Sequence, residues 1–174
     1  MLKRIFLAVL ILVAGVLIYA TTRPGTLHVE RAVDISAPPD RIASFITDFH
    51  MWRDWSPWEK LDPTMQRTFS GSPSGTGAVY EWAGNSDVGS GRMEITAATA
   101  DRITLKLDFL APFENHNTTT FTFAPSGSGT HVVWALDGPN PYLAKVMGIF
   151  VDMEKMIGAD FEKGLANLKA VAEK

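Results

Sequence analysis

The feature that most constrains the fold is a long block of strand-like sequence followed by a single amphipathic helix. Between Met65 and Asp137, apolar and polar side chains alternate, and clusters of Gly, Pro, Ser and Asn separate the alternating runs. This pattern is typical of short antiparallel strands joined by turns. The expected strands are Gln66 to Ser70, Ala78 to Trp82, Gly91 to Ala97, Arg102 to Phe109, Asn117 to Phe123 and His131 to Leu136.

Residues 140 to 172 predict one long helix. Asn140 and Pro141 fit an N-cap and a first helical position. The apolar residues that follow recur at the spacing of one helical face: Val146, Ile149, Phe150, Met153, Ile157, Phe161, Leu165 and Leu168. A helix of this length would measure about 45 Å.

A shorter pattern precedes the strand block. Leu27, Val29, Val33 and Ile35 alternate with mostly polar residues, which predicts a strand buried on one face, and Arg31 is the one break in the alternation. Residues 36–40 then read as a helix start, and the apolar positions that follow, Ile42, Phe45, Ile46 and Phe49, share one helical face. The chain therefore contains about seven strands, close to the usual antiparallel hairpin arrangement.

These elements predict an α+β fold in which the sheet curves. A single helix can cover one face of a sheet this large only if the sheet wraps around it. Because a strongly curved sheet and one helix cannot touch everywhere, we expect a cavity between them.

The N-terminus carries an apolar segment. Residues 5–20 contain no charged side chain and follow Lys3 and Arg4. As a helix, residues 5–22 would span about 27 Å, enough to cross the hydrocarbon core of a bilayer. A cleaved signal peptide is the alternative, but Ile18 would be an unfavourably large residue near a cut after Ala20.

We therefore expect a retained transmembrane helix in a single-pass protein. The basic N-terminus predicts a cytoplasmic start, which leaves the folded domain on the extracytoplasmic side, the periplasm in a bacterium. This interpretation divides the chain into residues 1–25, a membrane anchor with its linker, and residues 26–174, the ligand-binding domain.

Charge and composition exclude several classes of partner. The whole chain has a net charge of -3, but the first 25 residues hold three basic and no acidic side chains, so the remainder carries 13 basic and 19 acidic residues, or -6. A domain of this charge lacks the basic patch that nucleic-acid binding requires, so we expect no nucleic-acid partner. The sequence also lacks cysteine, which excludes disulfides, thiolate metal sites and a cysteine nucleophile.

Two local motifs point to a known superfamily. Residues 33–42 read VDISAPPDRI and residues 49–58 read FHMWRDWSPW. With the strand block and the terminal helix, these segments resemble the START-like (SRPBCC) superfamily, which includes START lipid-transfer domains, the birch-pollen allergen and the bacterial polyketide cyclase/dehydrase-like proteins. The resemblance covers about residues 27–171. It implies a helix-grip fold around a hydrophobic cavity for lipids, sterols or polyketide-like molecules, and it implies no universal catalytic residue.

Large apolar side chains are the candidates for lining this cavity. They come from the tryptophan-rich segment, the strands and the terminal helix, and they are Trp52, Trp55, Trp58, Tyr80, Trp82, Phe109, Phe121, Phe123, Trp134, Phe150, Met153 and Ile157. Aromatic rings offer much apolar area with few rotatable bonds. The three tryptophans between 52 and 58 admit three interpretations: a lid over the cavity mouth, a contact with the membrane interface, or a plug at one end of the core.

Polar chemistry has fewer candidates. His116, close to Glu114, is the best single acid or base if a reaction occurs, and a solvated strand-end histidine is the alternative. The four histidines show no metal-ligand spacing, so we expect no metal site. Dinucleotide and phosphate-loop motifs are absent from the sequence, so we expect no cofactor.

Three functions remain open at this point. The first is a membrane-anchored module that binds an apolar or lipid-like small molecule. The second is a cyclase, dehydratase or hydrolase acting on a hydrophobic substrate in the same cavity, which requires buried polar side chains that converge there. The third is a module that binds a protein partner, which predicts a filled interior and a large exposed apolar patch.

Overall fold

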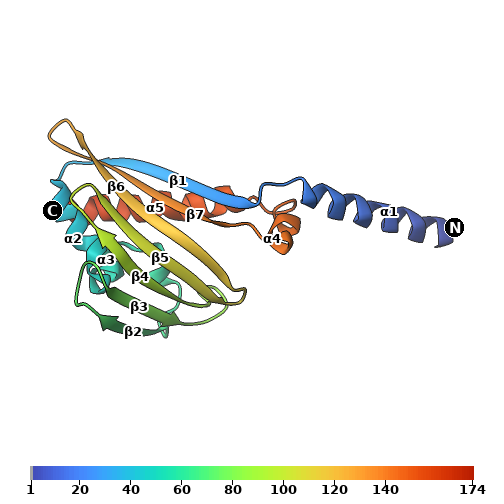
Figure 1. Cartoon of the computed structure of the whole chain (residues 1–174), viewed down its shortest axis with the longest axis horizontal. Helices are drawn as coiled ribbons and strands as arrows, with labels where there is room; N and C mark the ends of the chain where they lie inside the picture. Colours follow the sequence, from blue (N-terminus) through green and yellow to red (C-terminus); the bar gives the residue numbers. More distant parts are fainter. Residues whose placement is uncertain (1) are drawn as a thin grey trace.

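The computed structural model describes residues 2–174, and its main feature is a curved antiparallel sheet wrapped around one long helix (Figure 1). The seven strands lie in the order β1-β7-β6-β5-β4-β3-β2, so each strand after β1 pairs with the next in sequence and β1 closes against β7. Their bounds are β1 Thr26–Ile35, β2 Gln66–Gly71, β3 Ala78–Ala83, β4 Ser90–Ala98, β5 Arg102–Ala111, β6 Asn115–Ser126 and β7 Gly129–Pro139. The predicted α+β fold and its seven strands are confirmed.

The alternation of side chains determines which face of the sheet is buried. In β7, the buried residues Val132, Trp134 and Leu136 project toward the helix, because successive side chains of a strand point to opposite faces. The turn between β6 and β7 places Gly127 at a φ of 56°, a left-handed conformation that glycine adopts without steric cost.

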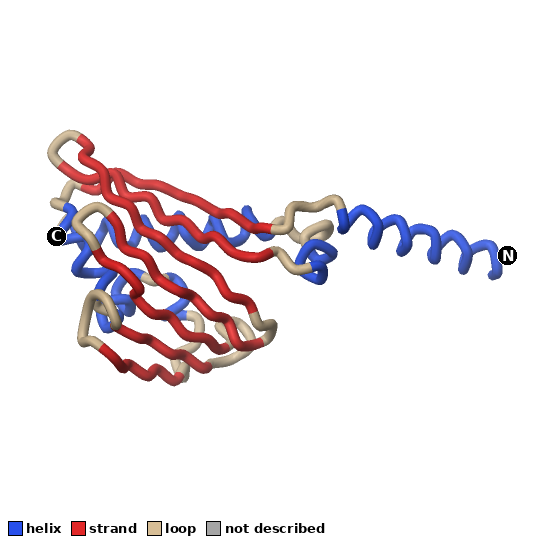
Figure 2. The backbone as a smooth tube through the Cα atoms, in the orientation of Figure 1, coloured by secondary structure: helices blue, strands red, loops and turns tan. Residues whose placement is uncertain are grey.

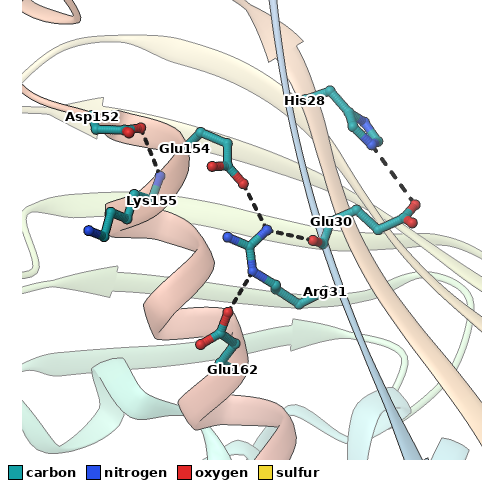
Figure 3. A network of polar contacts seen from close by, with 7 residues as sticks. All are labelled: His28, Glu30, Arg31, Asp152, Glu154, Lys155 and Glu162. Carbon is teal, nitrogen blue, oxygen red and sulfur yellow. Dashed lines mark hydrogen bonds and ion pairs between the residues drawn. The ribbon is translucent and has the colours of Figure 1, made fainter.

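Arg31, the break in the alternation of β1, lies on the inward face but is not packed in the core. Its guanidinium group reaches across α5 (Met153–Ala172). There Nη1 donates to Glu154 at 2.7 Å and Nε donates to Glu162 at 2.8 Å (Figure 3). Gly158 leaves the room, since a Cβ at that position would lie 2.0 Å from Nη2. Arg31 therefore clamps the first strand onto the helix.

The long helix expected over residues 140–172 is interrupted, which corrects the prediction. A short helix α4 covers Tyr142–Met147 with Pro141, not Asn140, at its N-cap, and α5 begins only at Met153. Gly148 follows α4, and Asp152 caps α5 by accepting a hydrogen bond from the backbone of Lys155. The helix in the sheet's grip is thus about 30 Å long.

The interruption also separates residues that a continuous helix would have placed on one stripe. Phe150 lies in the connection between the two helices, with 73% of its surface exposed. Val146 and Ile149 likewise belong to α4 and the connection, and only the positions from Met153 onward follow the face of α5.

The apolar N-terminal segment forms helix α1 (Leu2–Thr21), which projects away from the sheet (Figure 2). Its C-terminal part contacts α4, where the Tyr142 hydroxyl donates to the Leu17 carbonyl at 2.9 Å. Just beyond α1, Arg23 Nη2 donates to the carbonyl of Gly148, the residue after α4, at 3.0 Å. By length and composition, α1 is able to cross a membrane.

Four short helices cover the opposite end of the sheet. They are α2 (Pro39–Thr47), η1 (Phe49–Met51), α3 (Trp52–Trp55) and η2 (Pro57–Lys60). With the C-terminal half of α5 they enclose a packed core that includes Trp55, Phe121 and Leu168. The core therefore fills the half of the sheet that lies away from α1.

The strand register shows which loops lie near α1. Thr26 pairs with Pro139, Phe109 pairs with Asn115, and Ser90 pairs with Ala111. The start of β1, the end of β7, the β3–β4 connection and the β5–β6 connection consequently lie at one end of the sheet, the end from which α1 departs (Figure 1).

Candidate ligand-binding site

A cavity of about 370 Å³ lies between the concave face of the sheet and the N-terminal half of α5. It is partly open to solvent, and most of its lining is apolar. The residues that line it are Trp52, Ser56, Trp58, Glu59, Leu61, Met65, Tyr80, Trp82, Asp87, Val88, Met93, Leu107, Phe109, Thr119, Trp134, Leu136, Met156, Ile157, Asp160 and Phe161. This volume falls within the range of small-molecule sites, about 300–1,000 Å³.

Seven of the twelve residues selected from the sequence meet at this cavity. They are Trp52, Trp58, Tyr80, Trp82, Phe109, Trp134 and Ile157. Neighbouring strands and helices bring their rings into contact: Trp58 packs edge-on against Trp134, with ring centroids 5.8 Å apart, and Trp134 stacks on Phe161 at 4.0 Å. The cavity wall is therefore built from interlocked aromatic rings.

The other five selected residues lie elsewhere. Trp55, Phe121 and Phe123 are buried in the packed half of the core, deeper along the sheet than the cavity. Phe150 lies in the exposed connection between α4 and α5, and Met153 begins α5 without reaching the cavity. Alternation predicts that a residue points to the inward face of the sheet. It does not predict whether that part of the inward face is covered by packed core or by the cavity.

The tryptophan-rich segment forms the inner end of the cavity. Trp52 Nε1 donates to the Ile46 carbonyl and Trp55 Nε1 donates to the Phe45 carbonyl, both at 3.0 Å. Trp52 and Trp55 are almost fully buried, and Trp58 is the partly buried ring of the three. These bonds attach the segment to α2.

Several lining residues were missed because the selection favoured large rings. Met93, Leu107, Thr119 and Leu136 all occupy inward positions of their strands. Strand alternation is the one sequence signal for these four positions. Leu107 lies two residues from Phe109, and Thr119 lies two residues from Phe121, so each shares the inward face with a selected residue. The loop residues Asp87 and Val88 carry no such signal in the sequence.

The mouth of the cavity is held by bonds to the β3–β4 connection. Trp82 Nε1 donates to the Val88 carbonyl at 3.0 Å, and the ring of Trp82 lies over Gly91, where a Cβ would come within 2.4 Å of it. Asp62 accepts the backbone N–H of Asn85 at 2.8 Å. The hydrogen bond from the Thr64 hydroxyl is the main reason that the pKa of Asp62 lies below its ordinary value.

A buried ion pair supports one wall. Glu59 Oε2 accepts from Arg67 Nε at 2.7 Å, and Glu59 Oε1 accepts from the Tyr80 hydroxyl at 2.6 Å. Burial and then the bond to Glu59 raise the pKa of Tyr80 above its ordinary value. Burial lowers the pKa of Arg67, but its hydrogen bond and charge pairing with Glu59 outweigh burial and leave it raised. Tyr80 is therefore a stable donor, and both carboxylate oxygens of Glu59 are already bonded.

Three buried polar atoms on the concave side have no hydrogen-bond partner among the described residues: Thr119 Oγ1, Trp134 Nε1 and Asn117 Nδ2. Thr119 and Trp134 line the cavity, and the register places them diagonally on β6 and β7, since Phe121 pairs with Trp134. A hydroxyl and an indole N–H both donate hydrogen bonds. The cavity wall therefore contains two buried donors whose hydrogen-bonding capacity is unused among the described residues.

His116, the acid or base selected from the sequence, lies outside the cavity. Its Nδ1 is 2.7 Å from Asp108 Oδ1, and its side chain is largely exposed. Burial raises the pKa of Asp108, but hydrogen bonds with Lys106 and His116 outweigh it and lower that pKa. Asp108 alternates with Leu107 and Phe109, which line the cavity, so the pair lies on the convex face.

Within residues 2–174, no group of three or more His, Asp or Glu side chains is placed to hold a metal ion. A second hollow of about 240 Å³ lies beside η1 and β2, where His50 stacks on Phe69 with ring centroids 4.1 Å apart. It is smaller, more open to solvent and more polar than the cavity under α5.

Comparison with known proteins gives a match over almost all of the chain beyond α1. The model of the family described as "Polyketide cyclase / dehydrase and lipid transport" matches residues 26–173. None of the curated proteins compared with the chain matches it significantly.

Solved structures share the fold at low sequence identity. A protein from Chromobacterium violaceum superposes with a TM-score of 0.60 at 18% identity, covering 87% of this chain and 99% of its own. The di-domain aromatase/cyclase StfQ of the steffimycin biosynthetic pathway gives 0.64 at 13% identity, covering 85% of this chain and 51% of its own. Ara h 8.0201 gives 0.56 at 12% identity, covering 85% and 98%. At these identities the likeness concerns the fold alone.

Proposed function

This chain belongs to the polyketide cyclase / dehydrase and lipid transport family, and from that premise we propose that it is a membrane-anchored domain that binds one apolar or lipid-like molecule in the cavity under α5. The observation that carries the proposal is the cavity of about 370 Å³ with its mostly apolar, aromatic lining. Each CH₂ group transferred from water into such a site contributes about 0.8 kcal/mol, so an acyl or isoprenoid chain would be retained.

The seven selected residues that meet at the cavity are the proposed ligand contacts, together with Phe161 and Leu136. Trp134 and Phe161, which stack face to face, form a rigid part of the cavity wall. Thr119 Oγ1 and Trp134 Nε1 would donate to an oxygen of the ligand. The expected ligand is therefore mostly apolar and carries at least one acceptor oxygen.

Binding without a reaction is the function we propose, because Glu59 and Tyr80, two acid–base candidates of the cavity wall, are bonded to each other. Both carboxylate oxygens of Glu59 accept hydrogen bonds, and the raised pKa of Tyr80 disfavours its use as a base. His116 lies on the convex face. These observations favour binding over the cyclase, dehydratase or hydrolase alternative.

We propose that α1 is a retained anchor and that residues 26–174 form the ligand-binding domain. A helix of 20 residues measures about 30 Å, the thickness of a bilayer's hydrocarbon core. Lys3 and Arg4 favour a cytoplasmic N-terminus, which would leave the domain on the extracytoplasmic side.

The test uses the full chain purified from membranes with mild detergent. Native mass spectrometry followed by organic extraction should find one bound molecule per chain, and the uncharged fluorescent probe N-phenyl-naphthylamine should enter emptied protein. Ile157→Trp fills the cavity from α5 and should abolish both signals. Lys163→Trp, on an exposed position of the same helix, should preserve both.

A wild-type protein that carries no ligand and does not bind the probe would contradict the proposal. Equal binding by the two variants would also contradict it, since the ligand would then lie outside the cavity.

A further inference from the structure

Large apolar side chains are exposed at the end of the domain next to α1. Six of them, which we name the apolar rim, have 42% to 73% of their surface exposed. They are Leu110, Phe113, Leu143, Met147, Phe150 and Met156. A single exposed apolar residue is ordinary on a protein surface, but several gathered at one end indicate an interaction site.

The rim comes from two stretches that are distant in sequence. Leu110 and Phe113 lie at the β5–β6 connection. Leu143 and Met147 lie on α4, Phe150 lies in the connection to α5, and Met156 lies in the first turn of α5. The register places the β5–β6 connection at the same end of the sheet as the start of β1, where α1 departs (Figure 1). All of the rim therefore lies at the end of the domain from which α1 departs.

The position of α4 relates the rim to a bilayer. The Tyr142 hydroxyl is bonded to the carbonyl of Leu17, which lies one turn before the end of α1. Because α1 is only about 30 Å long, a membrane that covers it must reach the level of Leu17. Leu143 and Met147, one turn apart on α4, would then lie at the boundary between lipid chains and headgroups.

The cavity lining extends to the same end of the sheet. Val88 lies in the β3–β4 connection, Phe109 lies near the end of β5, and Met156 belongs both to the cavity lining and to the rim. A molecule that leaves the bilayer beside the rim would therefore meet the mouth of the cavity without crossing bulk water.

We propose that the apolar rim docks into the leaflet on the domain's side of the membrane, so that the cavity exchanges its ligand directly with the bilayer. This inference rests on the proposed anchoring by α1. Apolar insertion, not attraction to anionic lipid, supplies the contact, because the basic Arg23, Lys145 and Lys155 near the rim are offset by the acidic Glu114, Asp152 and Glu154. Docking should therefore occur on zwitterionic bilayers and persist at high salt.

The absence of cysteine from the sequence permits a direct test with single labels. Three full-length variants, Phe150→Cys, Ala100→Cys and Leu10→Cys, would each carry an environment-sensitive dye and be reconstituted into phosphatidylcholine bilayers containing spin-labelled lipids. Ala100 is the matched control, exposed in the β4–β5 turn at the opposite end of the sheet. Leu10 lies in the middle of α1 and reports on the anchor itself.

Docking predicts strong quenching by lipid labels at positions 10 and 150 and little at position 100, with the same pattern in high salt. Quenching at position 10 alone would overturn the docking proposal and leave the anchor intact. Quenching at none of the three positions would overturn the anchor, and docking with it.

Discussion

The Tyr80 hydroxyl donates a 2.6 Å hydrogen bond to Glu59, whose other carboxylate oxygen accepts from Arg67 at 2.7 Å. The side chains of Glu59 and Arg67 are only 6% and 13% exposed. Two charges removed from water in this way compensate each other, and each depends on its partner. One wall of the cavity thus contains the ion pair of Glu59 and Arg67, and the Tyr80 hydroxyl adds a hydrogen bond to it.

Removing one member of this pair should be costly. Arg67→Met leaves the Glu59 carboxylate buried without a cation, so the free energy of unfolding should fall by about 3–5 kcal/mol. Urea denaturation followed by tryptophan fluorescence measures the loss. Arg92→Met is the control, because Arg92 pairs with Glu94 at the surface, where such a pair contributes about 0–1 kcal/mol. Equal losses in the two variants would show that Glu59 is not buried as a charge.

Thr119→Val should have opposite effects on stability and on binding. The Thr119 hydroxyl is buried without a partner among the described residues, and replacing it with a methyl group removes a desolvated polar atom. The ligand-free protein should therefore gain about 1 kcal/mol in unfolding free energy. Affinity for the ligand should fall by about tenfold, the equivalent of one hydrogen bond worth 1.4 kcal/mol.

Calorimetry of ligand-free protein and titration with the extracted ligand check the two effects of Thr119→Val. Thr118→Val, at the neighbouring exposed position of β6, should change neither quantity by much. If Thr119→Val leaves affinity unchanged, the ligand does not use this hydroxyl.

The sequence predicts the fold well because the two-residue period of the strands and the helical period of α5 both correspond to elements of the structure. Alternation in the strands and the stripe from Met153 to Leu168 place the sheet and α5 correctly. The interruption at Gly148 was missed because an apolar spacing that continues through Phe150 does not reveal that the backbone has left the helix.

The candidate site was harder to predict than the fold. Phe121 and Thr119 lie two residues apart on the same face of β6, yet one is in the packed core and the other lines the cavity. The difference depends on how far α3 and η2 extend over the sheet, a tertiary relationship with no period in the sequence. Arg31, in contrast, broke its strand pattern because it clamps α5 across Gly158.

Two glycines of α5 should respond differently to alanine. Alanine normally stabilises a helix interior by about 1 kcal/mol relative to glycine. At Gly164 a Cβ would lie 2.7 Å from the ring of Trp134, which stacks on Phe121 and Phe161. Overpacking of this kind costs about 1–3 kcal/mol, so Gly164→Ala should lower the unfolding free energy and weaken probe binding.

Gly158→Ala is the matched comparison. Its Cβ would meet the end of the flexible Arg31 side chain, which can swing toward solvent. Alanine raises the helix propensity at this position, whereas displacement of Arg31 breaks its ion pairs with Glu154 and Glu162. The two effects oppose each other, so the free energy of unfolding should change by less than about 1 kcal/mol. Thermal unfolding of both variants measures the difference. A loss at Gly158 as large as that at Gly164 would show that Arg31 cannot move aside, and no loss at Gly164 would contradict the packing assigned to Trp134.

Acid should destabilise the protein partly through Asp62, which accepts hydrogen bonds from the Thr64 hydroxyl and from the backbone of Asn85. These bonds lower the pKa of Asp62 in the folded state. The stability that they contribute is therefore complete above the unfolded-state pKa of 3.8 and is lost as the pH falls through the lower folded-state pKa. Asp62→Asn should reduce the slope of unfolding free energy against pH below about pH 4, measured by urea denaturation. An unchanged slope would assign the acid sensitivity to other carboxylates with lowered pKa values, such as Asp108.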